Sequence, residues 1–401
     1  MNKRPLEGVL VADFSRVLAG PLATMTLADL GARVIKVERP GTGDDTRHWG
    51  PPYSTTGTTY FDSVNRNKES VCLDLAVPAD RALGVELALR ADVLVENFKP
   101  GGMDKLGLGY AELSVRNPGL VYASISGFGD RAGADLPGYD FIVQALGGLM
   151  SITGEPESSP TKAGVALVDV LTAKDTVIGI LAALNARHSD GRGAHLKLNL
   201  LSSLQGALAN QAQAFLGAGQ IPARMGNEHP SIVPYQLLEA ADGPVAIACG
   251  NDSQFAKLCQ ELGRPGLAAD GRFVTNKDRV KHRGDLIPLL ERALADAPAA
   301  EWQRRLSAAG VPAGKVATID QGLAYADSLG LEPTIDVRDD TGTIVGRQVR
   351  HPITWAPPLS ARAEAPPRLG QNTTDVISWL SADPVASHAN TSESLDFRAR
   401  K

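Results

Sequence analysis

Asp169 lies just before a long apolar run, within residues 164–172 (GVALVDVLT). Residues 176–184 are apolar and predict a buried helix, so this carboxyl group lies close to a helix start. An aspartate in such a place is most often an N-cap, which accepts hydrogen bonds from free backbone N–H groups. It can also be a carboxylate nucleophile at the positive end of a helix dipole, and one residue can serve both roles.

Two loops that follow predicted strands could hold a phosphate-bearing ligand. Residues 14–21 (FSRVLAGP) lead into a helix that begins near Pro21, and free N–H groups in its first turn could bind phosphate. In residues 96–102 (ENFKPGG), Asn97 could hydrogen-bond a base or an amide, and Phe98 could stack. An ordinary capped connection and a Pro-Gly surface turn are the alternatives. The fingerprint G-x-G-x-x-G is absent, which counts against a dehydrogenase.

The seven histidines and three cysteines show no pattern of a metal site or a hydrolase. The sequence contains no H-E-x-x-H pair and no G-x-S-x-G elbow. Cys72, Cys249 and Cys259 are odd in number and have no metal-ligand spacing. We expect them to be small core residues in a reducing cytoplasm, and we expect no metal.

Composition limits the class of protein further. The chain has 401 residues, of which 43% are hydrophobic and 21% charged, with a formal net charge of −5. This length predicts two domains, and the acidic balance argues against a nucleic-acid partner. The longest apolar stretch, residues 177–184, is too short to span a bilayer, and the first ten residues do not form a signal peptide. We therefore expect a cytoplasmic protein without membrane association.

The order of predicted elements indicates how these loops are positioned. In residues 1–220, short apolar strands alternate with helices, which predicts an α/β fold with a large, Rossmann-like, doubly wound parallel sheet. Residues 225–325 predict a smaller α+β domain, and residues 330–401 form a separate C-terminal segment. The strands expected in the large domain are residues 9–14, 34–38, 71–75, 93–95, 120–125 and 195–200.

Five segments in this order resemble the class III CoA-transferases (CaiB/BaiF), the family of formyl-CoA transferase and carnitine CoA-transferase. They are residues 13–21, 29–40, 65–68, 95–101 and the segment around Asp169, and the resemblance runs from about residue 6 to residue 380. Four further segments look closest to the branch that acts on dicarboxylates, such as succinate–hydroxymethylglutarate CoA-transferase. These are residues 43–52, 148–154, 199–203 and 229–235.

The resemblance implies an enzyme that moves CoA from an acyl-CoA, such as succinyl-CoA, to a free carboxylic acid. Asp169 would be the nucleophile and would form an aspartyl-CoA thioester, with Asp140 and the adjacent Tyr139 assisting. CoA and acyl-CoA are then substrates, and no cofactor is permanently bound. The family forms interlocked homodimers in which the C-terminal segment returns to the large domain, and we expect both features here.

The resemblance also implies ligand contacts. Lys105 stands where the family often has arginine, so it keeps the charge but loses the bidentate fork. A dicarboxylate needs a cation for its far carboxylate, and we expect Arg47 or Arg66, with His48 and His229 as lesser candidates. The implied CoA contacts are Val17, Ala19, Arg39, Leu73, Asn97, Phe98 and Lys105.

Gly250 and Asn251 lie in residues 250–254 (GNDSQ), which match the mobile loop that covers the site in the family. Such a loop would keep water away from a reactive anhydride. A plain strand-to-helix turn is an equal alternative for this segment.

Two other functions stay open on this reading. α-Methylacyl-CoA racemases share the fold, and they use a His–Asp pair together with a Glu of the other domain. Tyr139 and Asp252 stand at the His and Glu positions, and a phenol is a poor general base at neutral pH, which favours transfer. A CoA-binding module without turnover is the second alternative, and it would form no covalent adduct.

Overall fold

The structure is a computed structural model, and it describes residues 4–360 and 362–382. These residues form two compact units. The first comprises residues up to 147, residues 164–212 and residues from 332 onward, and the second comprises residues 148–163 and 213–331. Residues 148–163 cluster with the second unit, whereas the sequence pattern led us to place them in the large domain. No helix within the described ranges is long and apolar enough to cross a membrane.

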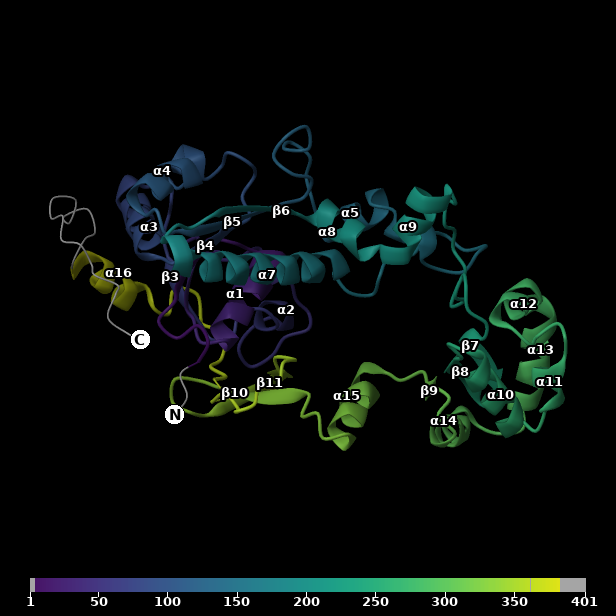
Figure 1. The fold of residues 1–401 in the computed structure, drawn as a ribbon. Helices are drawn as coiled ribbons and strands as arrows, with labels where there is room; N and C mark the ends of the chain where they lie inside the picture. The colour runs from purple at the N-terminus through teal and green to yellow at the C-terminus, as the bar shows by residue number, and fades with distance from the viewer. Residues whose placement is uncertain (1–3, 361, 383–401) are drawn as a thin grey trace. The chain divides into compact units, whose positions relative to one another are not determined.

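A six-stranded parallel sheet forms the centre of the first unit (Figure 1). Its strand order, β3-β2-β1-β4-β5-β6, is that of a doubly wound fold, so the predicted fold class is confirmed. The order reverses between β1 and β4, and ligands of such folds bind at the carboxyl ends of the strands near this point. The strands are β1 (Leu10–Asp13), β2 (Arg33–Glu38), β3 (Lys68–Cys72), β4 (Val93–Glu96), β5 (Val121–Ser126) and β6 (His195–Asn199).

Helices cover both faces of this sheet (Figure 1). Side chains alternate along β1, so Ala12 joins a buried cluster with α3, α4 and α16, whereas Asp13 points toward α1 and accepts a hydrogen bond from Thr24. The cluster includes Val376 and Leu380 of α16, so the chain end completes the core of the first unit. The helices are α1 (Ala19–Asp29), α3 (Pro78–Arg90), α4 (Tyr110–Arg116), α7 (Leu167–Asp190) and α16 (Thr373–Ala382).

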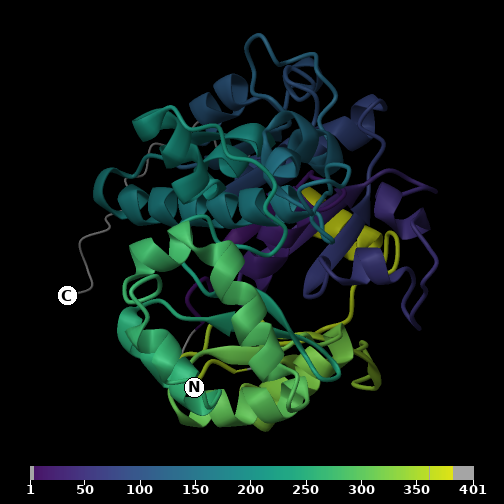
Figure 2. The ribbon, with the colours of Figure 1, turned by 90° about the vertical axis from the view of Figure 1, so that its right-hand side faces the viewer.

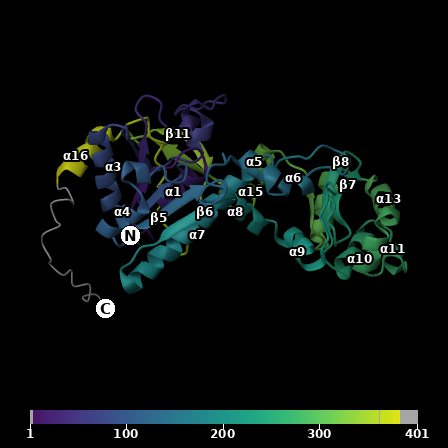
Figure 3. The ribbon, with the colours of Figure 1, turned by 90° about the horizontal axis from the view of Figure 1, so that it is seen from above.

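The 24-residue helix α7 extends the predicted apolar run in both directions. It packs against α1, β5 and β6, and Figure 3 shows it running beside the two strands. Thr172 and Thr176 are fully buried, and each hydroxyl donates to the carbonyl four residues earlier, so their burial leaves no hydroxyl unpaired. The helix ends at Gly191, whose φ of 71° is the left-handed conformation of a C-cap.

The remaining elements of the first unit are short. The helical stretch over residues 200–218 is divided in two near Leu208, and Ala209 has a φ of 42°. The second part, α9 (Ala209–Ala218), crosses the boundary between the units. The others are η1 (Asp45–His48), α2 (Thr59–Asp62), η2 (Asp104–Leu106), α5 (Asp140–Leu146), α8 (Leu200–Ala207), β10 (Thr334–Arg338) and β11 (Ile344–Val349).

The second unit has an antiparallel sheet in the order β7-β8-β9 and a core of its own. Trp302, Phe255 and Phe273 are the large side chains of this core. Figure 2 shows the helices α10–α14 of this unit in green. The elements are α6 (Leu149–Ile152), β7 (Tyr235–Ala240), β8 (Gly243–Ala248), α10 (Asp252–Glu261), α11 (Gly266–Ala269), α12 (Asn276–Lys281), α13 (Arg283–Leu294), α14 (Ala299–Ala308), β9 (Ala313–Lys315) and α15 (Ile319–Ser328).

Candidate active site

Asp169 is the third residue of α7 and not its N-cap. The N-cap is Ala166, which offers no side-chain acceptor. Asp140 takes this role from another helix, because its Oδ1 accepts hydrogen bonds from the backbone N–H groups of Val168 at 2.7 Å and Asp169 at 3.3 Å. The Asp169 carboxyl group therefore does not cap the helix, although it lies close to the positive end of the helix dipole.

Close backbone packing brings Tyr139 and Asp140 to this helix. They follow a loop that leaves the end of β5 and returns on itself, so that Gly127 and Gly138 meet backbone to backbone. A Cβ atom at either glycine would collide with the Cα of the other, so the approach requires two residues without side chains. Asp140 then begins α5, and its second oxygen accepts a hydrogen bond from Gln144 at 2.6 Å.

The surroundings of Asp169 favour its protonated form. Burial, together with the nearby charge of Asp140, raises the pKa of Asp169 to about 7. A partly desolvated carboxylate is a better nucleophile than one in water, and the dipole of α7 favours its ionised state. The site therefore presents a carboxyl group that can be either ionised or protonated near neutral pH.

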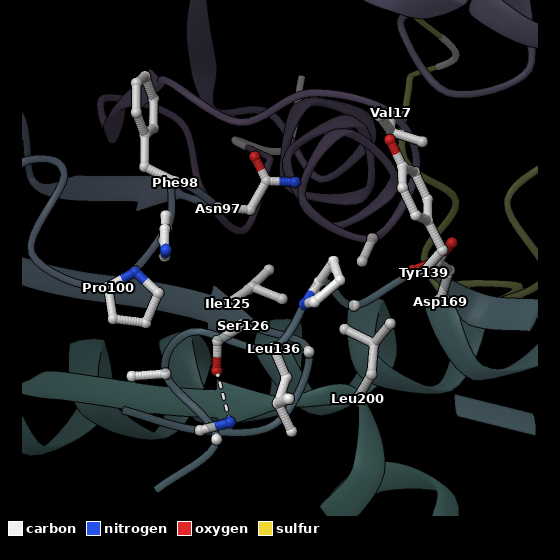
Figure 4. Close-up of a pocket in the computed structure, with 18 of the residues that line it drawn as sticks. Val17, Asn97, Phe98, Pro100, Ile125, Ser126, Leu136, Tyr139, Asp169 and Leu200 are labelled. Atoms are coloured by element: carbon white, nitrogen blue, oxygen red, sulfur yellow. Dashed lines mark hydrogen bonds between the residues drawn. The ribbon is translucent and has the colours of Figure 1, made fainter. Parts of the chain in front are cut away.

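Asp169 and Tyr139 line a cavity of about 350 Å³ at the carboxyl ends of the strands. Figure 4 shows Phe98 and Pro100 at one end of this cavity and Tyr139 and Asp169 at the other. Of the residues that the sequence suggested, Val17, Ala19, Asn97, Phe98, Tyr139 and Asp169 line this one cavity.

Val17 has a φ of 72°, which is unusual for a β-branched residue. Two side chains hold its turn in place. The amide of Asn97 accepts from the backbone N–H of Arg16 at 2.9 Å and donates to the carbonyl of Arg16 at 2.7 Å. The carboxylate of Asp44 accepts from the N–H of Val17 at 3.2 Å. Asn97 was expected to contact CoA through its side chain, but here its oxygen and nitrogen both pair with the Arg16 backbone.

Buried ion pairs lie beneath this turn. Lys36 binds Asp44 at 2.9 Å and also donates to the carbonyl of Ser15, while Lys68 binds Asp13 at 3.0 Å. Burial alone would raise the pKa of Asp13, but the two lysines and two hydroxyl donors outweigh it and lower the pKa to about 2. The ion pairs thus tie β1, β2 and β3 together immediately below the cavity.

A second cavity of about 390 Å³ lies at the ends of β1, β2 and β3. Arg39, Leu73 and Phe98 line it, and Phe98 therefore borders both cavities. Lys105 is exposed on η2, next to Leu106, which is also part of the lining. All seven expected CoA contacts thus line one of the two cavities or, in the case of Lys105, flank the second.

Arg47 and Arg66 were expected to bind a substrate carboxylate, but both have partners within the fold. Arg47 makes two hydrogen bonds to Glu38, at 2.7 and 2.8 Å, and its guanidinium covers the ring of Phe61. Arg66 pairs with Asp29 through two hydrogen bonds, and both side chains are buried. Neither arginine lines the cavity that contains Asp169. Their carboxylate partners within the fold argue against a role in binding the substrate.

The other expected residues are His48 of the first unit and four residues of the second unit. His48 is exposed, and its Nε2 lies 3.0 Å from the carbonyl of Thr42. Gly250, Asn251, Asp252 and His229 belong to the second unit. Within that unit Asn251 caps α10 by accepting from Gln254, whose side chain in turn accepts from the N–H of Gly250. The turn thus has the geometry of a strand-to-helix connection.

Sequence reasoning missed three residues at or beside this site, which are Tyr60, Trp49 and Arg16. Burial, together with the negative charges of Asp169 and Asp140, raises the pKa of Tyr60 to about 12. It therefore stays a neutral hydroxyl donor near the nucleophile. Its ring meets Trp49 edge to face at 5.2 Å. Tyr60 lies in the four-residue helix α2 and Trp49 directly follows η1, and both elements are too short to show hydrophobic periodicity. The only available signal was an aromatic residue within or near residues 43–52.

Arg16 was the third omission. It lines both cavities and pairs with Asp45, which also binds Arg39. Both guanidinium groups are more than half exposed, so this shared pair is accessible to an anion. No cluster of three or more His, Cys, Asp or Glu side chains suited to a metal occurs among the residues that the structure describes.

The cavity lies at the switch point of a doubly wound sheet, where such folds bind their ligands, and it has a carboxyl group at its end. The family model of CoA-transferase family III matches residues 6–373, and the chain belongs to this family. It is a CoA-transferase.

Individual relatives are named as CoA-transferases or as members of the same family. The chain is 42% identical to the succinate–glutarate CoA-transferase of Agrobacterium fabrum, over 94% of this chain and 96% of the relative. It is 46% identical to the acetyl-CoA:oxalate CoA-transferase of Acetobacter aceti, over 78% of this chain and 80% of the relative. A crystal structure of a CaiB/BaiF family protein from Brucella suis has a TM-score of 0.84 and 42% identity, and the match covers 94% of this chain and all of that one.

Proposed function

We propose that the protein transfers CoA between dicarboxylic acids, with a donor of the succinyl-CoA type, through an aspartyl-CoA thioester at Asp169. One observation carries the proposal. A partly buried carboxyl group with a raised pKa shares a cavity with the loops at the ends of β1 and β4, where a doubly wound fold binds its ligand. The names of the relatives support dicarboxylates as substrates.

The reaction exchanges one activated acyl group for another in four steps. The Asp169 carboxylate attacks the thioester carbonyl and gives a mixed anhydride and CoA thiolate. The thiolate attacks the Asp169 carbonyl, forms the aspartyl-CoA thioester and releases the donor acid. The acceptor carboxylate then attacks this thioester to give a second mixed anhydride, and the returning thiolate forms the new acyl-CoA. No net proton, electron or ATP is consumed.

The surrounding residues support these steps. Asp140 fixes the start of α7 and so orients Asp169. The neutral hydroxyl of Tyr60 can donate a hydrogen bond to an oxyanion that forms near Asp169. Tyr139, 60% exposed, borders the same end of the cavity and can contact the acyl group. These roles are part of the proposal.

The second cavity suits the nucleotide half of CoA. Phe98 connects the two cavities, so a pantetheine arm can pass it on the way from one to the other. Arg16 and Arg39 share Asp45, and a phosphate can compete with this carboxylate for both guanidinium groups. Val17, Ala19, Leu73, Asn97 and Lys105 complete the proposed contacts.

Covalent trapping tests the mechanism directly. The enzyme is incubated with succinyl-CoA and then with hydroxylamine, and peptide mass spectrometry should find the hydroxamate on Asp169. Asp169→Ala should lose transfer and labelling, whereas Asp175→Ala, an exposed carboxylate further along α7, should keep both. Labelling of any other residue would move the nucleophile. CoA binding without any adduct would favour a binding module instead.

The acceptor and the assembly need separate measurements. A panel of free mono- and dicarboxylic acids, tested with succinyl-CoA, should show preference for dicarboxylates. An equal rate with monocarboxylates would remove this part of the proposal.

The interlocked homodimer stays a prediction, and light scattering of the full chain should give twice the mass of one chain.

A further inference from the structure

A third cavity, of about 450 Å³, lies at the carboxyl ends of β4, β5 and β6. The proposed reaction does not use it. Glu96, Ser124 and His195, one from each strand, line it together with Tyr110 and other side chains. It shares Phe98 with the two cavities proposed to hold CoA.

A chain of hydrogen bonds connects the three strands at this place. Glu96 and Ser124 are direct partners in the register of β4 and β5, and their side chains are hydrogen-bonded. The hydroxyl of Ser124 lies 2.9 Å from Nε2 of His195 on β6. Aromatic contacts fix the imidazole, because the rings of Tyr110 and Tyr122 lie 4.7 and 5.1 Å from it.

This chain of hydrogen bonds ends at Phe98, which borders both cavities proposed to hold CoA. Oε2 of Glu96 accepts the backbone N–H of Phe98 at 2.8 Å, which fixes the turn after β4. The ring of Phe98 packs on one side against the buried core and borders all three cavities. Glu96 is only 6% exposed, so little water is available to replace it as the acceptor.

We propose that Glu96, Ser124 and His195 are positioning residues for CoA, which act by holding the Phe98 turn at the junction of the two CoA cavities. This inference rests on the proposed function. None of the three touches the reacting carboxyl group, so their loss should weaken CoA binding and leave the chemical step nearly intact. A loss of uniform binding raises KM at nearly constant kcat.

The groups around Glu96, Ser124 and His195 determine how these hydrogen bonds respond to pH. Burial raises the pKa of Glu96 to about 7, and Asp104 of η2 adds to this, whereas Ser124 and the N–H of Phe98 oppose it. Tyr122 of β5 faces the same carboxyl group, and burial raises its own pKa, so it stays neutral.

On the other side of the chain, burial and the charge of Lys197 lower the pKa of His195, while Asp104 and Asp130 oppose this effect. The ring of Tyr110 of α4 lies 4.7 Å from the imidazole. Burial and Lys197 thus favour the neutral imidazole. An ionised carboxylate is the stronger acceptor for the Phe98 N–H, so CoA affinity should fall as the pH falls through the pKa of Glu96.

The experiment measures CoA binding by calorimetry, together with KM and kcat for succinyl-CoA, in the full chain. Glu96→Ala should weaken CoA binding and raise KM about tenfold, the size expected from loss of one charge-assisted hydrogen bond. Its kcat should stay within about threefold of the wild-type value. Glu96→Gln keeps an acceptor for Phe98 and should restore most of the affinity. It should lack the change in CoA affinity that we expect of the wild type between about pH 6 and about pH 8. Glu112→Gln, an exposed glutamate of α4, is the matched control and should behave as wild type.

A double-mutant cycle separates a connected chain from three independent side chains. Ser124→Ala should weaken CoA binding, and the Glu96→Ala/Ser124→Ala pair should cost clearly less than the sum of the two single effects. Additive effects, or a Glu96→Ala variant that is folded and binds CoA as tightly as wild type, would overturn the proposal. If Glu96→Ala does not fold, unchanged pH dependence in Glu96→Gln would overturn it. Wild-type protein that binds no CoA would instead refute the proposed function.

Discussion

The Asp169→Asn variant lacks the nucleophile, but it should be more stable than the wild type at high pH. The difference in the free energy of unfolding should grow as the pH rises. The pKa of Asp169 is raised from 3.8 to about 7, so the folded chain holds this proton more tightly than the unfolded chain does. Stability contributed by the protonated group is complete below the unfolded pKa and is lost as the pH rises through the folded one. Asparagine has a similar shape and no charge, so it does not suffer this loss.

The size of the effect follows from the shift. One pKa unit corresponds to about 1.4 kcal/mol, so a shift of about three units sets a ceiling of about 4 kcal/mol above neutral pH. Asp169 keeps some solvent exposure, and the start of α7 favours its ionised form. We therefore expect the asparagine variant to gain about 1–2 kcal/mol in the free energy of unfolding at about pH 8, and almost nothing at about pH 4.

Urea unfolding of wild type and variant across this pH range measures the difference. Asp175→Asn removes a carboxylate from an exposed position on the same helix and should show no comparable gain with pH. A stability difference that is constant with pH, or a variant that is less stable than wild type at high pH, would refute the assignment of Asp169 as a group held partly protonated by its surroundings.

Two further substitutions test the structure around the cavity. Val17→Gly should relieve the strain of the left-handed φ of 72°. After the entropy cost of glycine, the free energy of unfolding should rise by about 0.5–1 kcal/mol, and KM for acyl-CoA should also rise. A loss of stability would show that Val17 is not strained. Arg66→Ala should destabilise the fold by about 3–5 kcal/mol, because it leaves the buried carboxylate of Asp29 without a cation and with only the hydrogen bond from Asn67. Its ranking of acceptor acids should match wild type, and a changed ranking would return Arg66 to the list of substrate ligands.

The sheet could be predicted because its strands are short apolar runs between turns. β1, β2, β4, β5 and β6 begin and end within one or two residues of the expected positions. β3 was placed three residues too late, because it begins with Lys68, Glu69 and Ser70, which look like a polar turn. Lys68 is buried there only because Asp13 and Asn65 bind its ammonium group, and no local pattern contains such partners.

The site was predictable in part for a similar reason. Asp169 stood out through its place before an apolar run, whereas the contribution of Asp140 depends on a loop returning from β5 over two touching glycines. Asn97 lines the cavity, but its pairing with the backbone of Arg16 joins residues 81 positions apart and has no local signal in the sequence. We expected Arg47 or Arg66 to bind the substrate because both lie near predicted site residues in the sequence. In the fold, their guanidinium groups instead bind the carboxylates of Glu38 and Asp29.

The return of the chain at residue 332 has a consequence for biosynthesis. α16 contributes Val376 and Leu380 to the same core as α3 and α4, so a nascent chain that ends before residue 370 leaves that face of the sheet uncovered. The second unit, with a core made from residues 233–313, is complete long before this. On the ribosome the inserted unit can therefore fold first, and the unit that starts the chain is the last to close.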